Sequence, residues 1–431
     1  MKRLWALVGA LAAGSWCAAP AAGADVEAAL RAMDRGEGVE AARTALAEEV
    51  ARLSILQAMI ERGEARRAAA ERASSLAPEG SWIVAAAAAL RAEASDDLPA
   101  AAGAAQRATE LAPNDARLWR FLAELRLRQQ DRAGARDALE RATALAPDSP
   151  LALVALGDLL REEGSFTAAF NAYNHAIGSD GGPASALLGR ATARLYFGDP
   201  DGALQDLERA AATSPPGSAR SRALMGILYL RSYLRQLPSG LDRAEEAARM
   251  WGELGAADEV AAVMNGAARV LLETGDPVSA EAWYQRGWQT VEGSAMPAAG
   301  KTIWQVRSLH GQARCAAVRR EIERANGFAD QAKALMAADA ANADHYAWIR
   351  PYLDAYIAMY DRRAEDAVPL LLASDTERPH IRLLLAEAYA RLRDRANARR
   401  WYERALAAAV DLDAESVIVR PQAATWLERN R

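Results

Sequence analysis

The stretch of sequence that decides the fold is residues 116–147, ARLWRFLAELRLRQQDRAGARDALERATALAP. Its composition of Ala, Leu, Arg and Glu favours helices, and runs of alternating β-branched residues typical of strands are absent from it. Small residues stand at Ala123, Ala135 and Ala142, where a larger side chain would force two crossing helices apart. Pro147 ends the second helix, because proline lacks the N–H donor and disfavours a helical residue before it. The stretch therefore predicts one antiparallel pair of helices.

These features recur every 34 residues, which is the strongest signal in the chain. Three columns of small residues keep this spacing: Ala89, Ala123, Gly157 and Ala191; Ala101, Ala135, Ala169 and Ala203; Ala108, Ala142, Ala176 and Ala210. Pro113, Pro147 and Pro215 follow the same period. Gly164 and Gly198 fall at the turn between paired helices, where a positive φ is inexpensive only for glycine.

The repeated unit resembles the tetratricopeptide repeat, whose pattern runs W-x2-L-G-x2-Y, then A-x3-F, then P. Trp119-x2-Leu122-Ala123 and Ala135-x3-Leu139 carry the resemblance in one copy. Leu385-Ala386-x2-Tyr389, followed by Ala398-x3-Tyr402, carries it near the C-terminus. The resemblance implies an all-α, right-handed superhelical solenoid of about eleven antiparallel helix pairs. It also implies that the first helix of each pair lines a concave, ligand-binding side.

The match varies along the chain and suggests five segments. They are residues 1–24, a signal peptide; 25–81, degenerate helical hairpins; 82–217, four regular repeats; 218–300, irregular hairpins; and 301–431, further repeats with a C-terminal capping helix. We expect that helix at roughly Asp413–Glu428, covering the open end of the stack. Bends in an otherwise continuous solenoid are expected at Ser214–Gly217 and Gly293–Gly300.

The first 24 residues have the pattern of a bacterial secretory signal. Lys2 and Arg3 precede the apolar run Leu4–Leu11, and Ala22-Gly23-Ala24 is a small-x-small site, so cleavage is expected after Ala24. The alternatives are an uncleaved membrane anchor and lipidation of Cys17, which Trp16 disfavours. The pattern predicts a periplasmic or secreted protein that contacts a membrane only through a partner.

The charge balance argues against nucleic acid as a partner. The chain has 52 basic and 57 acidic residues, and loss of the leader would remove two basic residues, leaving a net charge of −7. Phosphate binding depends on clustered positive charge, which this balance does not favour. After cleavage Cys315 is the remaining cysteine, so we expect a small buried thiol in a fold without an intramolecular disulfide.

Motifs that would carry catalysis are weak or absent. Residues 295–302, AMPAAGKT, match a loose phosphate-binding loop, but a helix instead of a strand precedes them, so we interpret them as a loop with Lys301 and Thr302 starting the next helix. His310, His345 and His380 are 35 residues apart but occupy different places in their repeats, which favours coincidence or a shared surface over a metal site. We therefore predict no catalytic, metal, cofactor or nucleotide site and no enzymatic activity.

The most distinctive feature is a group of aromatic residues. Tyr352, Tyr356 and Tyr360 recur every four residues and share one helix face, with Trp348 just before them. By the register set at Ala355 they fall on the concave side, as candidates for partner binding that would be partly exposed. Burial among neighbouring helices is the alternative.

The same register places charged and polar residues on the concave side of earlier repeats. They are Arg117, Arg120 and Glu124, then Asp158 and Arg161, then Thr192 and Tyr196. Arg117 and Arg120 are candidates for holding a carboxylate, with a solvated charged face as the alternative. We therefore predict a non-enzymatic scaffold for protein–protein interaction that holds a protein or peptide in its groove, in an envelope assembly or export system. The alternative is a glycan- or polysaccharide-binding accessory protein, in which exposed aromatic rings would stack on sugars.

Overall fold

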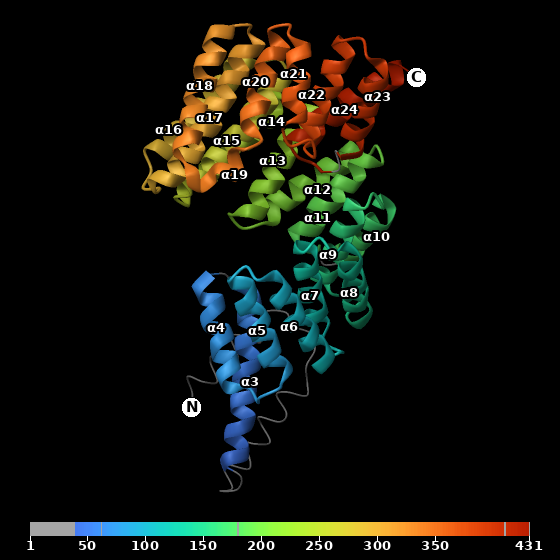
Figure 1. Ribbon diagram of the computed structural model, residues 1–431. Coiled ribbons are helices and arrows are strands. Elements are labelled where there is room, and N and C mark those ends of the chain that lie inside the picture. The colour runs from blue at the N-terminus through green and yellow to red at the C-terminus, as the bar shows by residue number, and fades with distance from the viewer. Residues whose placement is uncertain (1–38, 62, 179–180, 409–410, 431) are drawn as a thin grey trace. The chain divides into compact units, whose positions relative to one another are not determined.

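The computed structural model describes residues 39–61, 63–178, 181–408 and 411–430, and every regular element in these ranges is a helix (Figure 1). The expected signal peptide, Cys17 and residues 25–38 lie outside them. Among the described helices, none combines the length and apolar character needed to cross a bilayer. The chain forms two compact units, Met1–Leu156 and Gly157–Arg431, so the division falls within one helix and at neither of the two expected bends.

The first unit is built from successive helical hairpins. Its helices are α3 (Val39–Ile60), α4 (Gly63–Leu76), α5 (Trp82–Ala94), α6 (Leu98–Leu111), α7 (Ala116–Arg128) and α8 (Arg132–Leu145), followed by the start of α9 (Pro150–Glu162). Each even-numbered helix packs against the one before it, and α5 also contacts α3. This is the stacking expected of a solenoid.

The second unit continues the hairpins from Gly157. Its helices are the end of α9, α10 (Phe166–Ile177), α11 (Ala184–Tyr196), α12 (Pro200–Thr213), α13 (Ser218–Tyr233), α14 (Pro238–Glu253), α15 (Ala257–Glu273), α16 (Pro277–Glu292), α17 (Ala298–Val318), α18 (Ile322–Ala338), η1 (Ala340–Asn342), α19 (Ala343–Tyr346), α20 (Ile349–Tyr360), α21 (Ala364–Leu372), α22 (Pro379–Arg391), α23 (Arg395–Ala408) and α24 (Ala414–Arg429). The described residues thus hold ten hairpins and a terminal helix, against about eleven expected. The expected all-α repeat fold is confirmed.

The turns inside the hairpins repeat with the 34-residue period. The residues before the second helix that adopt positive φ are Asp96, Gln130, Gly164 and Gly198, at 57°, 64°, 78° and 75°. The next residue caps that helix: the carboxylates of Asp97, Asp131 and Asp199 accept backbone N–H bonds of 2.9–3.0 Å. Such caps satisfy donors that the first helical turn leaves unpaired. The turn predicted at Gly164 and Gly198 is confirmed.

The small-residue columns lie where the helices touch. Ala123, Ala135 and Ala169 have no exposed surface. Around Tyr173 the fit is tightest: a Cβ added to Gly157 would lie 2.7 Å from the ring, and one added to Gly189 would lie 2.3 Å from it. The Tyr173 hydroxyl donates a 2.7 Å hydrogen bond to Asp158, which fixes the ring between the two glycines.

Replacing Gly157 with leucine is therefore expected to lower the free energy of unfolding by about 1–3 kcal/mol, because the added side chain overlaps the Tyr173 ring. Urea denaturation followed by circular dichroism measures the change. Gly252→Leu is the matched control, since no atom lies within 4 Å of a Cβ at that helical position. Equal stability of the two variants would show that the column is not close-packed.

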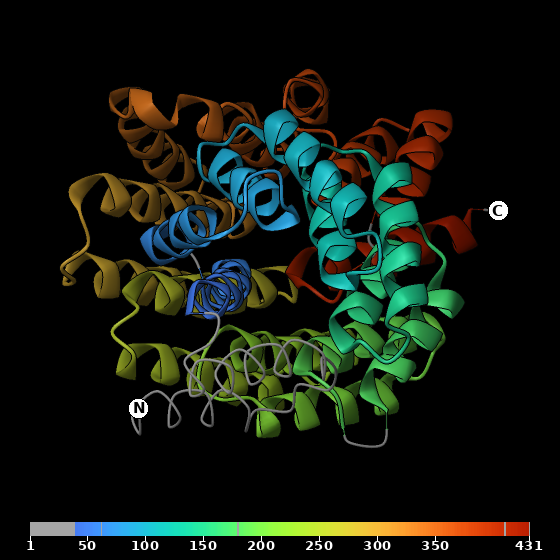
Figure 2. The ribbon, with the colours of Figure 1, turned by 90° about the horizontal axis from the view of Figure 1, so that it is seen from below.

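The terminal helix α24 does more than cover the end of the stack. It packs against α22 and α23, as expected, but it also contacts α13 and α15. In Figure 2, α24 (dark red) runs from the C-terminus inward to helices drawn in green and yellow. The last helix therefore links the final hairpin to helices near the beginning of the second unit.

Candidate functional site

The first helices of successive hairpins form a continuous inner layer in the second unit. α11 contacts α13, α13 contacts α15, α15 contacts α17, α17 contacts α20, and α20 contacts α22. This layer carries the aromatic group predicted from the sequence on α20, two of the spaced histidines on α17 and α22, and Arg314, which the sequence did not single out.

Tyr352 and Tyr356 are 1% and 2% exposed, so the expectation that their rings are partly exposed is wrong. Tyr360 and Trp348 are half-buried. The tyrosine rings follow one another along α20, with centroids 6.0 Å apart from Tyr352 to Tyr356 and 5.1 Å apart from Tyr356 to Tyr360. Burial removes the ground for stacking Tyr352 and Tyr356 on sugar rings. Partner binding by these four residues stays a prediction.

Two of the spaced histidines meet at Tyr352. The ring of His310 lies 5.3 Å from the Tyr352 ring, and the ring of His380 lies 5.2 Å from it on an adjoining helix. Burial and the nearby arginines lower the pKa of His310 well below its ordinary value, and the same causes lower the pKa of His380 to about 4. Both rings are therefore neutral at pH 7. No group of three metal-ligating side chains occurs among the described residues.

Arg314, on α17, is 2% exposed, and no ion pair to it is found among the described residues. One nitrogen, Nη2, donates a 2.7 Å hydrogen bond to the Tyr284 hydroxyl. The guanidinium lies 5.9 Å from the ring centroids of both Tyr284 and Tyr356. Its Nε and Nη1 have no hydrogen-bond acceptor. A buried cation without a hydrogen-bonded carboxylate is costly, and the faces of the two tyrosine rings offset part of that cost.

Glu387 contributes a half-buried carboxyl group on α22. Burial, reinforced by the charge of Glu273, raises its pKa to about 7. Between about pH 4.5 and pH 7 the folded protein therefore holds a proton that the unfolded chain has released. Stability from this group is present at acidic pH and is lost as the pH rises through 7.

We accordingly expect Glu387→Gln to raise the free energy of unfolding by about 2 kcal/mol at pH 8 and to leave it nearly unchanged at pH 4.5. Glutamine keeps the shape of the side chain and cannot ionise. Urea denaturation of wild type and of Glu387→Gln at the two pH values measures the difference in free energy of unfolding. The titration of other groups affects both proteins alike and largely cancels in this difference. A pH-independent difference would contradict this account.

A cavity of about 400 Å³ opens beside α24 in the second unit. Its walls come from α9, α11, α13, α15 and the segment before α24, and they include Arg161, Thr192, Ser221, Arg222, Tyr229, Glu259, Asp411 and Asp413. Arg161 and Thr192 were expected on the concave side, and here they line one cavity. Tyr196, also expected there, lies under the guanidinium of Arg420, 4.0 Å from it.

The charged residues predicted on the first unit lie on α7. Arg117 is exposed but already engaged, because its Nε and Nη2 donate to both oxygens of Asp115 at 2.9 and 2.6 Å. Arg120 is half-buried, and Glu124 is exposed. Their role in partner binding stays a prediction, with Arg117 less available for a ligand carboxylate than the sequence suggested.

The remaining motifs support no chemistry of their own. Cys315 is buried, as expected, and burial raises the pKa of its thiol to about 12, so it is not a nucleophile. Helix α17 begins at Ala298, earlier than expected, so Lys301 lies inside its first turn with its ammonium donating to the Glu292 carbonyl at 2.8 Å. Helix α16 precedes this turn, so the strand that a phosphate-binding loop requires is absent from this place.

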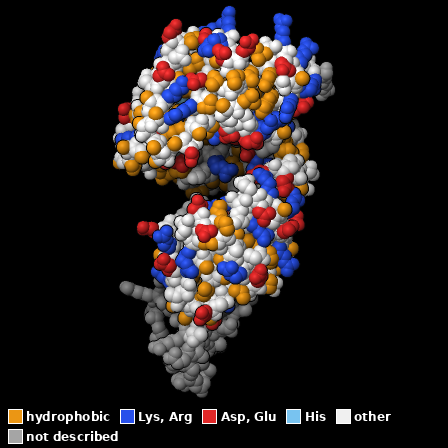
Figure 3. Space-filling view, viewed as in Figure 1, with side chains coloured by type: hydrophobic (Ala, Val, Ile, Leu, Met, Phe, Trp, Pro, Cys, Tyr) orange, Lys and Arg blue, Asp and Glu red, His pale blue; other side chains and the backbone are white. Residues whose placement is uncertain are grey.

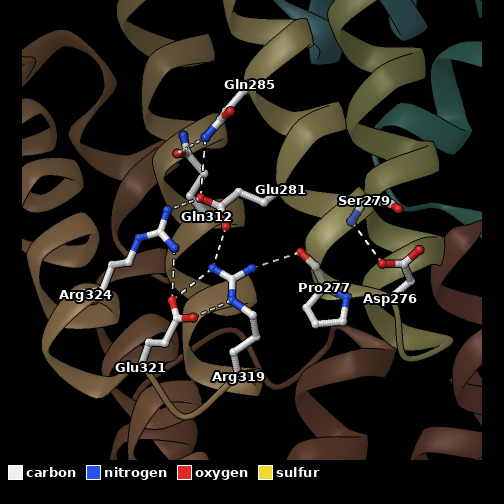
Figure 4. Close-up of polar contacts among 9 residues, drawn as sticks. All are labelled: Asp276, Pro277, Ser279, Glu281, Gln285, Gln312, Arg319, Glu321 and Arg324. Carbon is white, nitrogen blue, oxygen red and sulfur yellow. Dashed lines mark hydrogen bonds and ion pairs between the residues drawn. The ribbon is translucent and has the colours of Figure 1, made fainter.

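A second cavity, of about 340 Å³, lies between α16 and α17 and is lined mainly by glutamines such as Gln285, Gln289 and Gln312. Beside it Glu281 accepts hydrogen bonds from Arg319 and Arg324, which join α16 to α17 and α18 (Figure 4). On the surface shown in Figure 3, basic and acidic side chains are interspersed in each unit, which agrees with the unfavourable charge balance for binding phosphates.

Comparison with known proteins gives the following. Two tetratricopeptide-repeat family models match, at residues 116–159 and 379–409. No curated protein matches the chain. Among solved structures, a tetratricopeptide repeat protein from Parabacteroides merdae is 17% identical, with 59% of this chain and 93% of that one covered and a TM-score of 0.41. PilF of Pseudomonas aeruginosa is 21% identical, with 51% and 91% covered and a TM-score of 0.36.

A Rap protein complexed with competence and sporulation factor is 12% identical, with 90% of this chain and 99% of that one covered and a TM-score of 0.45. Likeness at this level concerns the fold alone. The two family-model matches fall on α7 to α9 and on α22 to α23, where the turn and small-residue columns described above are found. The chain therefore contains tetratricopeptide repeats at these two places, within an all-α repeat fold.

Proposed function

We propose that the protein is an exported, non-enzymatic scaffold that binds a protein or peptide partner on the inner helices of its second unit. Tetratricopeptide repeats are surfaces for protein–protein interaction, and the observation that carries the proposal is the 400 Å³ cavity among α9, α11, α13 and α15. The proposed setting is the bacterial periplasm or exterior, in an envelope assembly or export system. It rests on the signal-like pattern of residues 1–24 and on analogy within the family.

The cavity wall suits a peptide because it combines three kinds of contact. Leu207, Met225 and Val263 are buried apolar residues that would contact side chains. Arg222 and Glu259 are exposed charges of opposite sign that would fix the direction of a bound chain. A surface with apolar contacts and a few placed polar groups is typical of specific binding sites.

The test is partner capture from envelope extract by immobilised full-length protein, with bound proteins quantified by mass spectrometry. Arg222→Glu reverses an exposed charge on the cavity and is expected to reduce capture of the partner at least about tenfold, because it removes the positive one of the two charges that would fix the direction of a bound chain. Arg400→Glu on the outer helix α23 is the matched control, because Arg400 is also exposed but does not line the cavity. Equal loss in both variants, or loss in neither, would reject this site.

A further inference from the structure

The inner face of the second unit already holds a peptide segment, which is the chain's own C-terminal region. Three carboxylates stand close together at its start, Asp411, Asp413 and Glu415, within what we call the acidic segment (residues 411–416). Helix α24 follows directly, capped by the Asp413 carboxylate, which accepts a 2.6 Å hydrogen bond from the Ser416 N–H. An acidic residue at a helix N-terminus is favoured by the helix dipole, so this segment is a stable helix start.

The acidic segment contacts two arginines and a histidine from three inner helices. Asp411 forms an ion pair with Arg161 of α9. Glu415 lies 2.9 Å from Nδ1 of His380 on α22 and 3.6 Å from the guanidinium of Arg269 on α15. Arg161 and His380 are 8% and 5% exposed. Through its carboxylates, this one short segment therefore links α9, the first inner helix of the unit, to α22, the last.

The basic surface offers more donors than the acidic segment uses. Nε and Nη1 of Arg314 and Nε2 of His310 are buried without an acceptor, and so is Nε of Arg269. Arg222, at the cavity, is exposed beside Asp411 and Asp413 in the wall. Of these groups only Arg222 is exposed, so it is the guanidinium that an additional carboxylate of a ligand would contact.

Helix α24 is divided at Pro421 into two parts, and the first part buries Val417, Ile418 and Val419 against the inner helices. Pro421 lies inside the helix and cannot donate a hydrogen bond to the preceding turn, which weakens the helix there. Beyond it, Ala423 is fully buried, and the Trp426 ring stacks on Tyr402 of α23 with centroids 4.4 Å apart. The second part of α24 is thus anchored independently of the acidic segment.

We propose that residues 411–420 are an intramolecular ligand of the inner face and are displaced by an acidic peptide segment of the partner. The matching partner segment carries two or three carboxylates in one helical turn, followed by branched apolar residues, as in the chain's own DLDAESVIV. This proposal rests on the proposed scaffold function and names its ligand and its regulation. A ligand tethered to the same chain competes with free ligands at an effective concentration of about millimolar. It would therefore prevent weak ligands from binding to the inner face.

The test uses a fluorescein-labelled synthetic peptide of residues 411–429, added to the full-length protein and followed by fluorescence anisotropy. Wild type is expected to bind it weakly, because the tethered copy occupies the face. The double variant Asp411→Asn/Glu415→Gln weakens the tethered copy and is expected to bind the peptide at least about tenfold more tightly. A peptide carrying the same two substitutions is expected not to bind.

Glu428→Gln is the matched control, since Glu428 is an exposed carboxylate on the anchored part of α24 and should leave binding as in wild type. If the double variant is poorly folded, amide hydrogen exchange of the wild-type protein provides the test instead. Excess peptide should raise the exchange rate of the backbone amides of residues 414–420 and leave that of residues 422–429 unchanged. A folded double variant that binds no peptide, or unchanged exchange at residues 414–420, overturns the proposal. One further outcome distinguishes this proposal from the scaffold function. If Arg222→Glu reduces partner capture but the double variant captures as much partner as wild type, the intramolecular ligand is rejected and the scaffold function still stands.

Discussion

Replacing Tyr356 with alanine is expected to lower the free energy of unfolding by about 3–5 kcal/mol, the range for removing a buried aromatic side chain. The ring is 2% exposed and belongs to the apolar cluster around α20. Its loss would leave a cavity beside Arg314, whose guanidinium lies 5.9 Å from the ring centroid. Urea denaturation followed by circular dichroism measures the effect.

Tyr360→Ala is the matched control on the same helix. Its ring is half-buried, so the expected loss is smaller, about 1–2 kcal/mol. The partial exposure expected from the sequence would imply that both variants keep most of their stability and lose only partner capture. The burial of Tyr356 reverses that expectation for this residue. A Tyr356→Ala variant that unfolds at the wild-type urea concentration would restore the interpretation of an open groove.

The repeat could be predicted from the sequence because it depends on contacts close along the chain. Ala123, Ala135 and Gly157 lie where neighbouring helices cross, and any larger residue there would clash with a side chain of the same or the next hairpin. Gly164 marks a turn that needs a positive φ. These constraints recur with the period and leave a visible pattern.

Part of the inner surface could also have been found. Arg269 and Glu387 directly follow Ala268 and Ala386, just as Tyr356 follows Ala355 in the register used to place the tyrosines. Applying that register to every repeat would have placed Arg269 and Glu387 on the same face as Tyr356. Arg314 stands elsewhere in its repeat, and the register would not have identified it.

The contacts of the C-terminal segment could not be predicted, because they join distant parts of the chain. Arg161 and Asp411 are 250 residues apart in sequence, and the ion pair between them leaves no local pattern. The sequence did predict a terminal helix from Asp413, and α24 begins at Ala414 with Asp413 as its cap. It could not show that this helix reaches α13 and α15 as well as the last hairpin.

The second large effect is expected at Glu281, the buried carboxylate on α16 that accepts hydrogen bonds of 2.5 Å from Arg319 and 2.6 Å from Arg324 (Figure 4). It is 7% exposed, whereas the Arg324 side chain is 48% exposed. Replacing Glu281 with alanine is expected to lower the free energy of unfolding by about 3 kcal/mol, because Arg319 and Arg324 would both lose the buried carboxylate that they share.

Glu321→Ala provides the matched control, since Glu321 binds the same two arginines at 2.9–3.1 Å from a more exposed position. We expect little change there, because solvent screens exposed pairs. The dependence on salt concentration distinguishes the two variants further. In 1 M NaCl, any loss of stability in Glu321→Ala should become smaller, whereas most of the loss in Glu281→Ala should remain, because buried ion pairs are screened less. If the two variants lose the same amount of stability, and salt reduces both losses equally, Glu281 is a surface residue in solution. A loss confined to Glu281→Ala would show that this carboxylate, which the repeat pattern does not mark, holds α16 against the α17–α18 hairpin.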